Sequence, residues 1–450
     1  MQCPCPGVDG MRVKSCGRSG VVVLAMALAL TAFAVPAQAH RVPAADPTVI
    51  TRWDDIAVRT IALEGGKPPP VAALYLGFMS AAVYDAVVSI EGGYAPYGGR
   101  LGVHVRRHAS SPAAAATAAY RILSFYFPAS AVALASDYQT ELAAIPDGRA
   151  KDAGVAVGEA AAARIERLRK DDGRDDPSVV YTRAPAPGVW RPTPPPAPPA
   201  PPSPFVLAWL GFVRPLVLNS PTQIPLPGPD ALTSRRYARD FQEVKDFGSA
   251  TGSARTPEQT ATALFWSVSV VVQYQAGFRD LALRNGLDIA SSARLFAVLN
   301  AATADAGIAC WRAKYDFAYW RPITAIQLAD TDGNPATAPD KTWTPLVGTP
   351  AYPDYPSGHA CLTGATSAGL SAFFGARHID LDVISLVATT PARHFDTARA
   401  LNEETMNARI WLGLHFRRAM TDANRLGQDV ASYVLRNAFR PVWGRDWGHG

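Results

Sequence analysis

Helical periodicity recurs along most of the chain after residue 50, and this pattern limits the possible folds more than any other sequence feature. Apolar residues return every three or four positions, as on one face of an α-helix, and no segment alternates long enough for a large sheet. The sequence therefore predicts a mostly helical protein, with helices at about 51–63, 71–90, 112–126, 130–144, 149–169, 256–285, 291–314, 359–375, 396–412 and 421–438.

A proline-rich segment interrupts this pattern at residues 184–204, where prolines occupy nearly every second position. Proline fixes φ and donates no backbone hydrogen bond, so the segment is expected to be extended and polyproline-like. It is either a linker between domains or a rigid strap over the helical body. Trp190 and Arg191 within it, and the apolar residues 205–217 after it, favour the strap.

The N-terminal residues are typical of a secretory signal peptide. Arg12, Lys14 and Arg18 precede a short apolar run at residues 21–35, and a small-residue cleavage pattern ends at Ala39. We therefore expect residues 1–39 to be removed and the mature protein, residues 40–450, to be periplasmic or secreted. The alternative is an anchoring transmembrane helix, but the run is short for a span, and no later segment is expected to form a stable membrane span.

Charge and cysteine content narrow the possible partners. Removing residues 1–39 takes away three cations and Asp9, which lowers the formal charge from +5 to +3. A charge this close to neutral gives no reason to expect nucleic acid or an anionic membrane surface as a partner. Cys310 and Cys361 belong to the mature chain, and they are either joined in a disulfide, which export permits, or two buried free thiols.

The chemistry concentrates in the last third of the chain, where the first of three short segments contains Lys314 and Arg321-Pro322. Seven residues make two helical turns, so both cations are expected on one helix face, with Pro322 marking the helix end. Two cations on one face repel each other unless an anion lies between them. The face is either solvated or, as its aromatic neighbours favour, buried around an anion (Trp311, Phe317, Tyr319 and Trp320).

The second segment is Tyr355-Pro356-Ser357-Gly358-His359. Ser357 is a favourable N-cap, and Gly358 lets a ligand approach the backbone closely. A helix that begins here would direct free N–H groups at an anion, with the Ser357 hydroxyl beside them. His359 in the first turn is placed for proton exchange with the bound group. The alternative is an ordinary capped helix with an incidental histidine.

The third segment runs from Arg409 to His415. Arginine offers a planar pair of donors for two oxygens of a tetrahedral anion. Gly413 allows the chain to turn, so His415 need not continue the helix. A core histidine is the ordinary alternative for this segment alone. Together, the three segments predict one pocket for a phosphate-shaped oxyanion, formed by Lys314, Arg321, Ser357, Gly358, His359, Arg409 and His415.

The order Lys-x6-Arg-Pro, Pro-Ser-Gly-His and Arg-x5-His resembles the signature of one superfamily, which holds the vanadium-dependent haloperoxidases and the type 2 phosphatidic acid phosphatases. The N-terminal half is similar to secreted bacterial haloperoxidase-like members at residues 53–57, 69–73, 82–86 and 189–192. The resemblance implies an all-α fold of packed helical bundles in a single domain over residues 40–450. It also places the active site in a C-terminal bundle at about residues 290–440.

The resemblance implies a role for each pocket residue. Vanadate is the expected cofactor, and its oxygens, or those of phosphate in the same site, would be bound by Lys314, Arg321, Ser357, Gly358, His359 and Arg409. His359 would be the acid–base residue, and Lys314 would also be catalytic. His415 would be the apical ligand of vanadium, or the nucleophile that takes a phosphoryl group. Trp311 and Tyr352 match positions on the halide side of the pocket.

Two positions depart from the pattern of the superfamily. Ala408 stands where members often have serine. Ala419 stands where many members place an aspartate that orients the last histidine and fixes its tautomer. Asp422, expected at the start of the next helix, is the candidate replacement.

Three functions fit these residues. A haloperoxidase would use vanadate as a Lewis acid, so that hydrogen peroxide oxidises a halide, which then halogenates a small organic substrate. A phosphatase would use His415 as the nucleophile on a phosphate monoester, with His359 protonating the leaving group. A non-catalytic oxyanion-binding scaffold is the third. Trp311, Tyr352 and the long helical N-terminal half favour the haloperoxidase, with bromide preferred over chloride.

Overall fold

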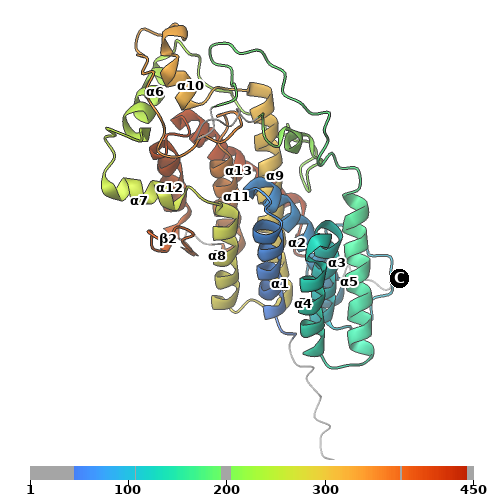
Figure 1. Ribbon diagram of the computed structural model, residues 1–450. Coiled ribbons are helices and arrows are strands. Elements are labelled where there is room, and N and C mark those ends of the chain that lie inside the picture. Colours follow the sequence, from blue (N-terminus) through green and yellow to red (C-terminus); the bar gives the residue numbers. More distant parts are fainter. Residues whose placement is uncertain (1–44, 107, 194–203, 376–377, 443–450) are drawn as a thin grey trace, which may run out of the picture. The chain divides into compact units, whose positions relative to one another are not determined.

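The computed structural model describes residues 45–106, 108–193, 204–375 and 378–442 (Figure 1). These residues form the helices α1 to α13 and one short two-stranded sheet, so the predicted all-α fold is confirmed. The predicted signal peptide, residues 1–39, lies outside the described residues.

The N-terminal helices pack around α2 (Pro69–Glu91), which begins at a proline already shaped for a first helical turn. Every residue from Pro70 to Val88 is buried, so α2 is not the amphipathic helix that its periodicity indicated. The helices that surround it are α3, α5 and α9. The remaining members of this region are α1 (Thr48–Val58), a π-helical turn (Arg59–Glu64), α3 (Ser111–Tyr126), α4 (Ala131–Ala143) and α5 (Arg149–Leu168).

Two described helices, α2 and α9 (Ile289–Phe317), are long and apolar enough to cross a membrane. The sequence analysis expected no stable membrane span after the signal peptide, and by length and composition alone these two helices would pass as spans. Their most apolar windows are 100% and 94% buried within the protein, because other helices cover them. In this fold their apolar side chains form the core.

The C-terminal bundle is built on α9, which contacts α2 as well as α11 (Gly358–Phe374) and α13 (Arg417–Asn437). Helices α11 and α13 lie very close together. A Cβ atom on Gly364 would lie 2.1 Å from the carbonyl oxygen of Asn424, and one on Gly427 would lie 2.0 Å from that of Cys361. Glycine is therefore needed at position 364 of α11 and at position 427 of α13 for this packing.

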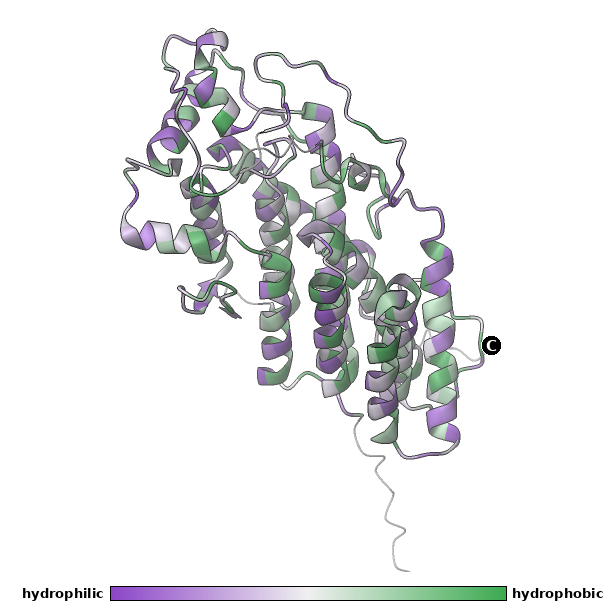
Figure 2. Cartoon of the chain, viewed as in Figure 1, coloured by the Kyte–Doolittle hydropathy of each residue, from purple (hydrophilic) through white to green (hydrophobic). Residues whose placement is uncertain are grey.

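The remaining elements surround the bundle (Figure 1): α6 (Arg235–Gly248), α7 (Pro257–Phe265), α8 (Val270–Arg284), α10 (Pro322–Gln327), α12 (Ala398–Trp411), and the antiparallel strands β1 (His378–Val383) and β2 (Arg393–Thr397). Figure 2 shows hydrophilic and hydrophobic residues mixed along α8 and α5, as in helices with one face towards solvent. The sequence predicted a single helix at 256–285, but the structure has two, because α7 ends at Phe265 and Ser269 before α8 has an extended backbone.

The described part of the proline-rich segment packs against the turn between α9 and α10. The backbone N–H of Trp190 donates to the carbonyl oxygen of Ala318 at 2.7 Å, and that of Trp320 donates to Gly188 at 3.0 Å. The Trp190 side chain is buried. Residues 184–193 therefore form a strap on the helical body, while residues 194–203 lie outside the described residues.

Cys310 and Cys361 are both buried free thiols. The sequence left open a disulfide or two free thiols for this pair, and the structure shows free thiols. The Cys310 thiol lies 3.6 Å from the carbonyl oxygen of Pro356, directly before Ser357. The pair therefore belongs to the packed core beneath the start of α11.

Candidate active site

Lys314 and Arg321 reach the pocket from two different elements, so the prediction that they share one helix face is wrong. Helix α9 ends at Phe317, because Ala318 adopts a left-handed conformation with φ of 48° and its N–H caps the carbonyl of Lys314. Pro322 begins α10 instead of ending α9, and Arg321 is the N-cap residue of α10. The sequence spacing fits two helical turns, but the turn at Ala318 separates the two cations.

Both cations are nevertheless completely buried and lie over the same ring. The Lys314 ammonium lies 4.9 Å, and the Arg321 guanidinium 4.8 Å, from the centre of the Tyr352 ring. Lys314 Nζ donates to the carbonyl oxygen of Pro353 at 2.7 Å, and Arg321 Nε donates to that of Tyr352 at 2.7 Å. Backbone carbonyls thus fix both positions without neutralising either charge. Burial lowers the pKa of Lys314 to about 8.

Ser357 occupies the N-cap position of α11, as expected, but its hydroxyl does not cap the helix. The Oγ atom is buried and has no hydrogen-bond partner among the described residues. Its backbone N–H donates to the carbonyl oxygen of Ala419 at 3.0 Å, which fixes the residue. At Gly358, an added Cβ would lie 3.0 Å from the Trp311 ring, so only glycine fits without displacing the indole.

His359 lies partly exposed at the start of α11, with its Nε2 atom 3.2 Å from the carbonyl oxygen of Val268. A carbonyl only accepts, so Nε2 carries the proton and Nδ1 keeps the lone pair in the neutral ring. Desolvation of the ring lowers the pKa of His359 well below its usual value, and the charges of Arg409, Arg321 and Lys314 add to this shift. His359 is therefore neutral near pH 7.

Arg409 and His415 are separated by the end of α12, as the sequence predicts. Gly413 has a φ of 76°, and a Cβ atom there would lie 2.5 Å from the carbonyl oxygen of Gly248, so the turn requires glycine. Arg409 is buried and donates from Nη1 to the carbonyl oxygen of Trp266 at 2.8 Å. Burial lowers its pKa to about 10.

His415 is held between a carboxylate and a guanidinium. Its Nδ1 atom lies 2.7 Å from Oδ1 of Asp354, and both side chains are almost inaccessible to solvent. Arg321 Nη1 lies 3.2 Å from the other ring nitrogen, Nε2. Because burial, Arg321 and Lys314 lower the pKa of His415, its ring is neutral, with Nδ1–H donating to the carboxylate and the lone pair on Nε2.

Asp354 is the carboxylate that the sequence prediction missed, and Asp422 is not the replacement for it. Asp422 Oδ2 instead accepts from the Tyr355 hydroxyl at 2.8 Å and pairs with Arg418 Nε at 2.8 Å. Helix α13 begins at Arg417, four residues before its predicted start, so Asp422 lies in the second turn of this helix and not in the first. The signal for Asp354 was its position three residues before Ser357.

The segment between α7 and α8 was also missed. Trp266 and Val268 offer backbone carbonyls to Arg409 and His359, as described above. The indole Nε1 of Trp266 donates to Oε1 of Glu404 on α12 at 2.8 Å, and this carboxylate pairs with Arg393 of β2 at 2.9 Å. Backbone acceptors have no signature in a sequence, so only this tryptophan could have drawn attention to the segment.

Unsatisfied buried donors test whether the pocket fits an oxyanion. Among the predicted pocket residues, three donors are buried without a hydrogen-bond partner in the described part of the chain: Arg321 Nη2, Ser357 Oγ and Arg409 Nε. Three buried cations stand against one buried carboxylate, and burial raises the pKa of Asp354 to about 7, although Arg321 and Lys314 oppose this. Uncompensated cations and unpaired donors suit a multiply charged tetrahedral anion such as vanadate or phosphate.

Trp311 and Tyr352 form one wall beside these donors. Their ring centres lie 5.1 Å apart, and the Trp311 side chain is buried. Tyr352 is partly exposed, so it lies nearer the opening of the pocket than Trp311 does. The structure thus brings together all the residues that the three sequence segments supplied, together with the two that were assigned to the halide side.

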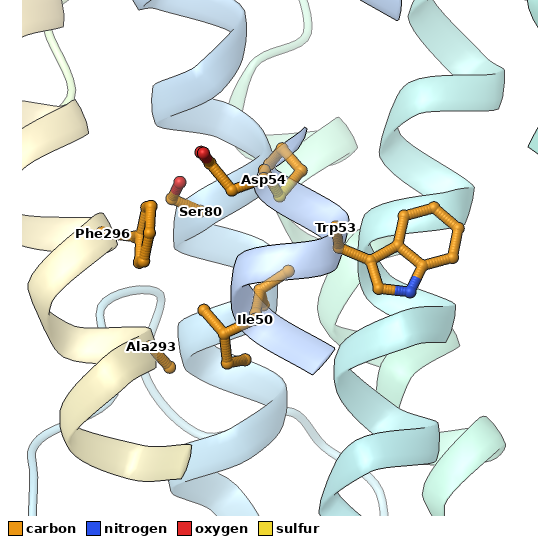
Figure 3. A pocket seen from close by; sticks show the side chains of 8 residues that line it. Ile50, Trp53, Asp54, Ser80, Ala293 and Phe296 are labelled. Carbon is orange, nitrogen blue, oxygen red and sulfur yellow. The ribbon is translucent and has the colours of Figure 1, made fainter. Parts of the chain in front are cut away.

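A separate cavity of about 10 Å³ lies among α1, α2 and α9, far along the chain from these motifs (Figure 3). Asp54 and Ser80 both line this cavity, and the Trp53 indole points away from the other labelled side chains. Asp54 is ion-paired with Arg279 at 2.8 Å. The Trp53-Asp54 pattern in the N-terminal half therefore belongs to helix packing.

Comparison with known proteins identifies the family. Residues 294–444, which include every predicted pocket residue, match the family model of the VCPO second helical-bundle domain. Over 227 residues, or 36% of this chain, the sequence is 28% identical to the vanadium chloroperoxidase of Curvularia inaequalis. These likenesses support the superfamily that holds the vanadium-dependent haloperoxidases and the type 2 phosphatidic acid phosphatases. The matched region spans 36% of the length of the Curvularia haloperoxidase.

Solved haloperoxidase structures extend the similarity to the fold of the whole described chain. A structure described as the first bacterial vanadium-dependent iodoperoxidase has a TM-score of 0.72 at 23% identity, covering 87% of this chain and 95% of that one. A holo-type bacterial vanadium-dependent chloroperoxidase has a TM-score of 0.69 at 17% identity, covering 87% and 97%. At these identities the likeness shows the haloperoxidase fold, and the activity is a separate question.

Proposed function

We propose that this protein is a vanadate-dependent haloperoxidase, which uses hydrogen peroxide to oxidise halide and thereby halogenates small organic substrates. One observation carries the proposal: three buried cations and three unpaired donors converge on two neutral histidines of opposite tautomer. The match of the C-terminal bundle to the VCPO domain supports haloperoxidase chemistry in this site.

The oxygens of vanadate would be held by Lys314, Arg321, Arg409, the Ser357 hydroxyl and the first turn of α11. The lone pair on Nε2 makes His415 the residue that would bind vanadium. When bound, vanadate supplies Lewis-acid activation of hydrogen peroxide.

His359 would then move a proton at Nδ1. In the anion-free pocket, the neighbouring cations lower its pKa. A bound oxyanion offsets those charges and so raises the basicity of the ring. Nδ1 can take a proton from hydrogen peroxide while the Nε2–H stays hydrogen-bonded to Val268. The partial exposure of His359 gives peroxide access to this atom.

The aromatic wall of Trp311 and Tyr352 is the proposed halide side. The Tyr352 ring lies against both Lys314 and Arg321, so both positive charges would attract a halide bound near this ring. Bromide is more polarisable and more easily oxidised than chloride, and we propose it as the preferred halide. We also propose that the chain is exported, from the signal-peptide pattern in residues 1–39; a mature N-terminus at His40, determined by mass spectrometry, would support this.

A phosphohistidine phosphatase is the second candidate, and the Asp354–His415 pair favours it. A carboxylate on Nδ1 increases the basicity of Nε2, which is also what attack on a phosphate monoester requires. The two reactions therefore share every residue of the pocket. Only a measurement of both can separate them.

The test loads anion-free protein with orthovanadate and measures peroxide-dependent oxidation of chloride, bromide and iodide. In parallel, vanadate-free protein receives a chromogenic phosphate monoester. We expect halide oxidation, with kcat/KM higher for bromide than for chloride. Phosphate release without halide oxidation would contradict the haloperoxidase proposal and favour the phosphatase. If the parent and a His359→Ala variant match in both assays, the protein is an oxyanion-binding scaffold.

A further inference from the structure

Asp354 contacts His415 through Oδ1 and is fixed through its backbone, while its Oδ2 is buried without a hydrogen-bond partner among the described residues. Its backbone N–H donates to the carbonyl oxygen of Tyr319 at 2.9 Å, and its own carbonyl oxygen lies 3.2 Å from Lys314 Nζ. Its carboxylate has His415 as its side-chain partner, at 2.7 Å, and Lys314 and Arg321 make no side-chain hydrogen bond to it in the described structure. The carboxylate is therefore dedicated to one imidazole rather than to an ion-pair network.

We infer that Asp354 is the positioning residue for His415, holding Nδ1–H so that Nε2 presents its lone pair to the bound oxyanion. This inference rests on the proposed oxyanion site. A flip about χ2 of His415 would place ring carbons where the two nitrogens lie, and the Arg321 Nη1 atom lies almost equally close to both nitrogens, at 3.2 and 3.4 Å. Arg321 therefore does not select which nitrogen carries the proton, whereas an acceptor on Nδ1 alone fixes both the ring orientation and the tautomer.

Position 419 faces the same place from the opposite side. A cavity of about 10 Å³ is lined by both Asp354 and Ala419, together with Tyr319, Phe416 and Arg418. The Ala419 side chain is buried against this space. An aspartate at position 419 would direct its carboxylate into the cavity that the Asp354 carboxylate borders. Positions 354 and 419 thus line one cavity, and the chain carries the carboxylate that bonds His415 at position 354.

Asp230 and Asp240 line this cavity as well, so a carboxylate at position 419 beside the one at position 354 would add to existing repulsion, and acidic residues at both positions would be costly. We therefore predict that the carboxylate can be moved from position 354 to position 419. Removing the carboxylate at position 354 should be harmful, adding one at position 419 should be harmful alone, and both changes together should restore the orientation of His415. A role for Asp354 in packing alone would predict no such rescue.

The test compares two anions in the full chain without peroxide or halide. Orthovanadate would bind through the cage and through His415 Nε2, whereas sulfate would bind through the cage alone. We expect Asp354→Ala to weaken orthovanadate binding by about 10–100-fold, in the range found for such supporting partners, and to leave sulfate binding unchanged. Calorimetry gives both affinities, and the ⁵¹V NMR signal of the bound vanadate reports its coordination.

Asp354→Ala with Ala419→Asp should recover most of the vanadate affinity and the parent ⁵¹V signal. Asp354→Asn, which keeps the shape and an acceptor oxygen, should lie between the parent and Asp354→Ala, and it serves if the alanine variant does not fold. Asp422→Ala is the matched control, because this carboxylate pairs with Tyr355 and Arg418 instead, and it should leave both affinities unchanged.

Two results would overturn the inference. One is parent-like vanadate binding by Asp354→Ala, and the other is an equal loss of vanadate and sulfate affinity that Ala419→Asp does not repair. If the parent chain itself binds neither anion, the proposed oxyanion site fails, and this inference fails with it.

Discussion

The carbonyl oxygen of Trp266 accepts a hydrogen bond from Nη1 of Arg409 at 2.8 Å, and this contact joins a pocket cation to the segment between α7 and α8. Two residues later, Val268 accepts from His359. The Trp266 indole is in turn held by Glu404, which pairs with Arg393. One short segment outside the sequence motifs therefore holds Arg409, which we propose binds the anion, and His359, which we propose transfers the proton.

Glu404 holds the Trp266 indole, so removing its carboxylate should displace both Arg409 and His359. We expect Glu404→Ala to lower kcat/KM for bromide by about 10- to 100-fold, because small misplacements of reacting groups have effects of this size. Steady-state kinetics of the vanadate-loaded protein measure this. The neighbouring Glu403→Ala is the control, since Glu403 pairs only with exposed Arg399. Equal kinetics for the two variants would show that Glu404 has no such role.

The unpaired hydroxyl of Ser357 should matter only when an anion is bound. Ser357→Ala should weaken phosphate binding by about 1.5–3 kcal/mol, the size of a hydrogen bond to a charged group. The anion-free variant should unfold at the same temperature as the parent or higher, since a buried unsatisfied group has been removed. Calorimetry and thermal melts check both. Thr366→Ala, another buried unpaired hydroxyl on α11, should leave phosphate affinity unchanged.

His359 should contribute to the reaction far more than to binding. We expect His359→Ala to lower kcat for bromide oxidation by about 10²–10⁴-fold, the usual contribution of general acid–base catalysis, with orthovanadate affinity little changed. Comparison of kcat with calorimetric affinity separates the two effects. His394→Ala, at an exposed histidine of β2 bonded to Asp382, is the control. A His359→Ala variant with parental kcat would remove His359 from the proposed mechanism.

The charge of Lys314 should make anion binding depend on pH. Burial lowers its pKa from 10.5 to about 8 in the anion-free fold, so the folded state binds fewer protons than the unfolded state between these values. The anion-free protein should therefore gain stability from this group as pH rises from about 8 to 10.5.

Sulfate affinity should fall over the same range, because Lys314 loses its charge while sulfate keeps its own. Calorimetry at a series of pH values measures this. A Lys314→Met variant should bind sulfate weakly on both sides of pH 8, without the fall that the parent shows there. A parent affinity that stays constant through the pKa of Lys314 would contradict this assignment of charge.

The sequence predicted the pocket because its members lie in short motifs whose spacing carries the chemistry. It predicted Gly413 as a turn, and the positive φ there bears this out. It failed at Ala318, because an alanine in the left-handed conformation cannot be recognised from the sequence as a glycine can. The spacing of seven residues between Lys314 and Arg321 therefore suggested two turns of one continuous helix. It failed at α2, because periodicity does not distinguish a helix covered on all sides from one at the surface.

The missed contacts share one physical cause. Asp354 and His415 are 61 residues apart, and Trp266 and Arg409 are 143 apart, so only the folded chain brings them together. A carbonyl oxygen is present at every residue, and one carboxylate among many is not distinctive. The motifs thus supply the proposed oxyanion-binding residues, while the groups that orient these residues come from the tertiary structure.

The most direct test of the oxyanion pocket as a haloperoxidase site is a titration of anion-free protein with orthovanadate, followed by peroxide-dependent bromination of a phenolic dye. We predict that bromination appears only with vanadate, saturates at a single equivalent per chain, and is suppressed by competing inorganic phosphate. Bromination that stays at background under saturating vanadate, or that phosphate does not suppress, would contradict this account.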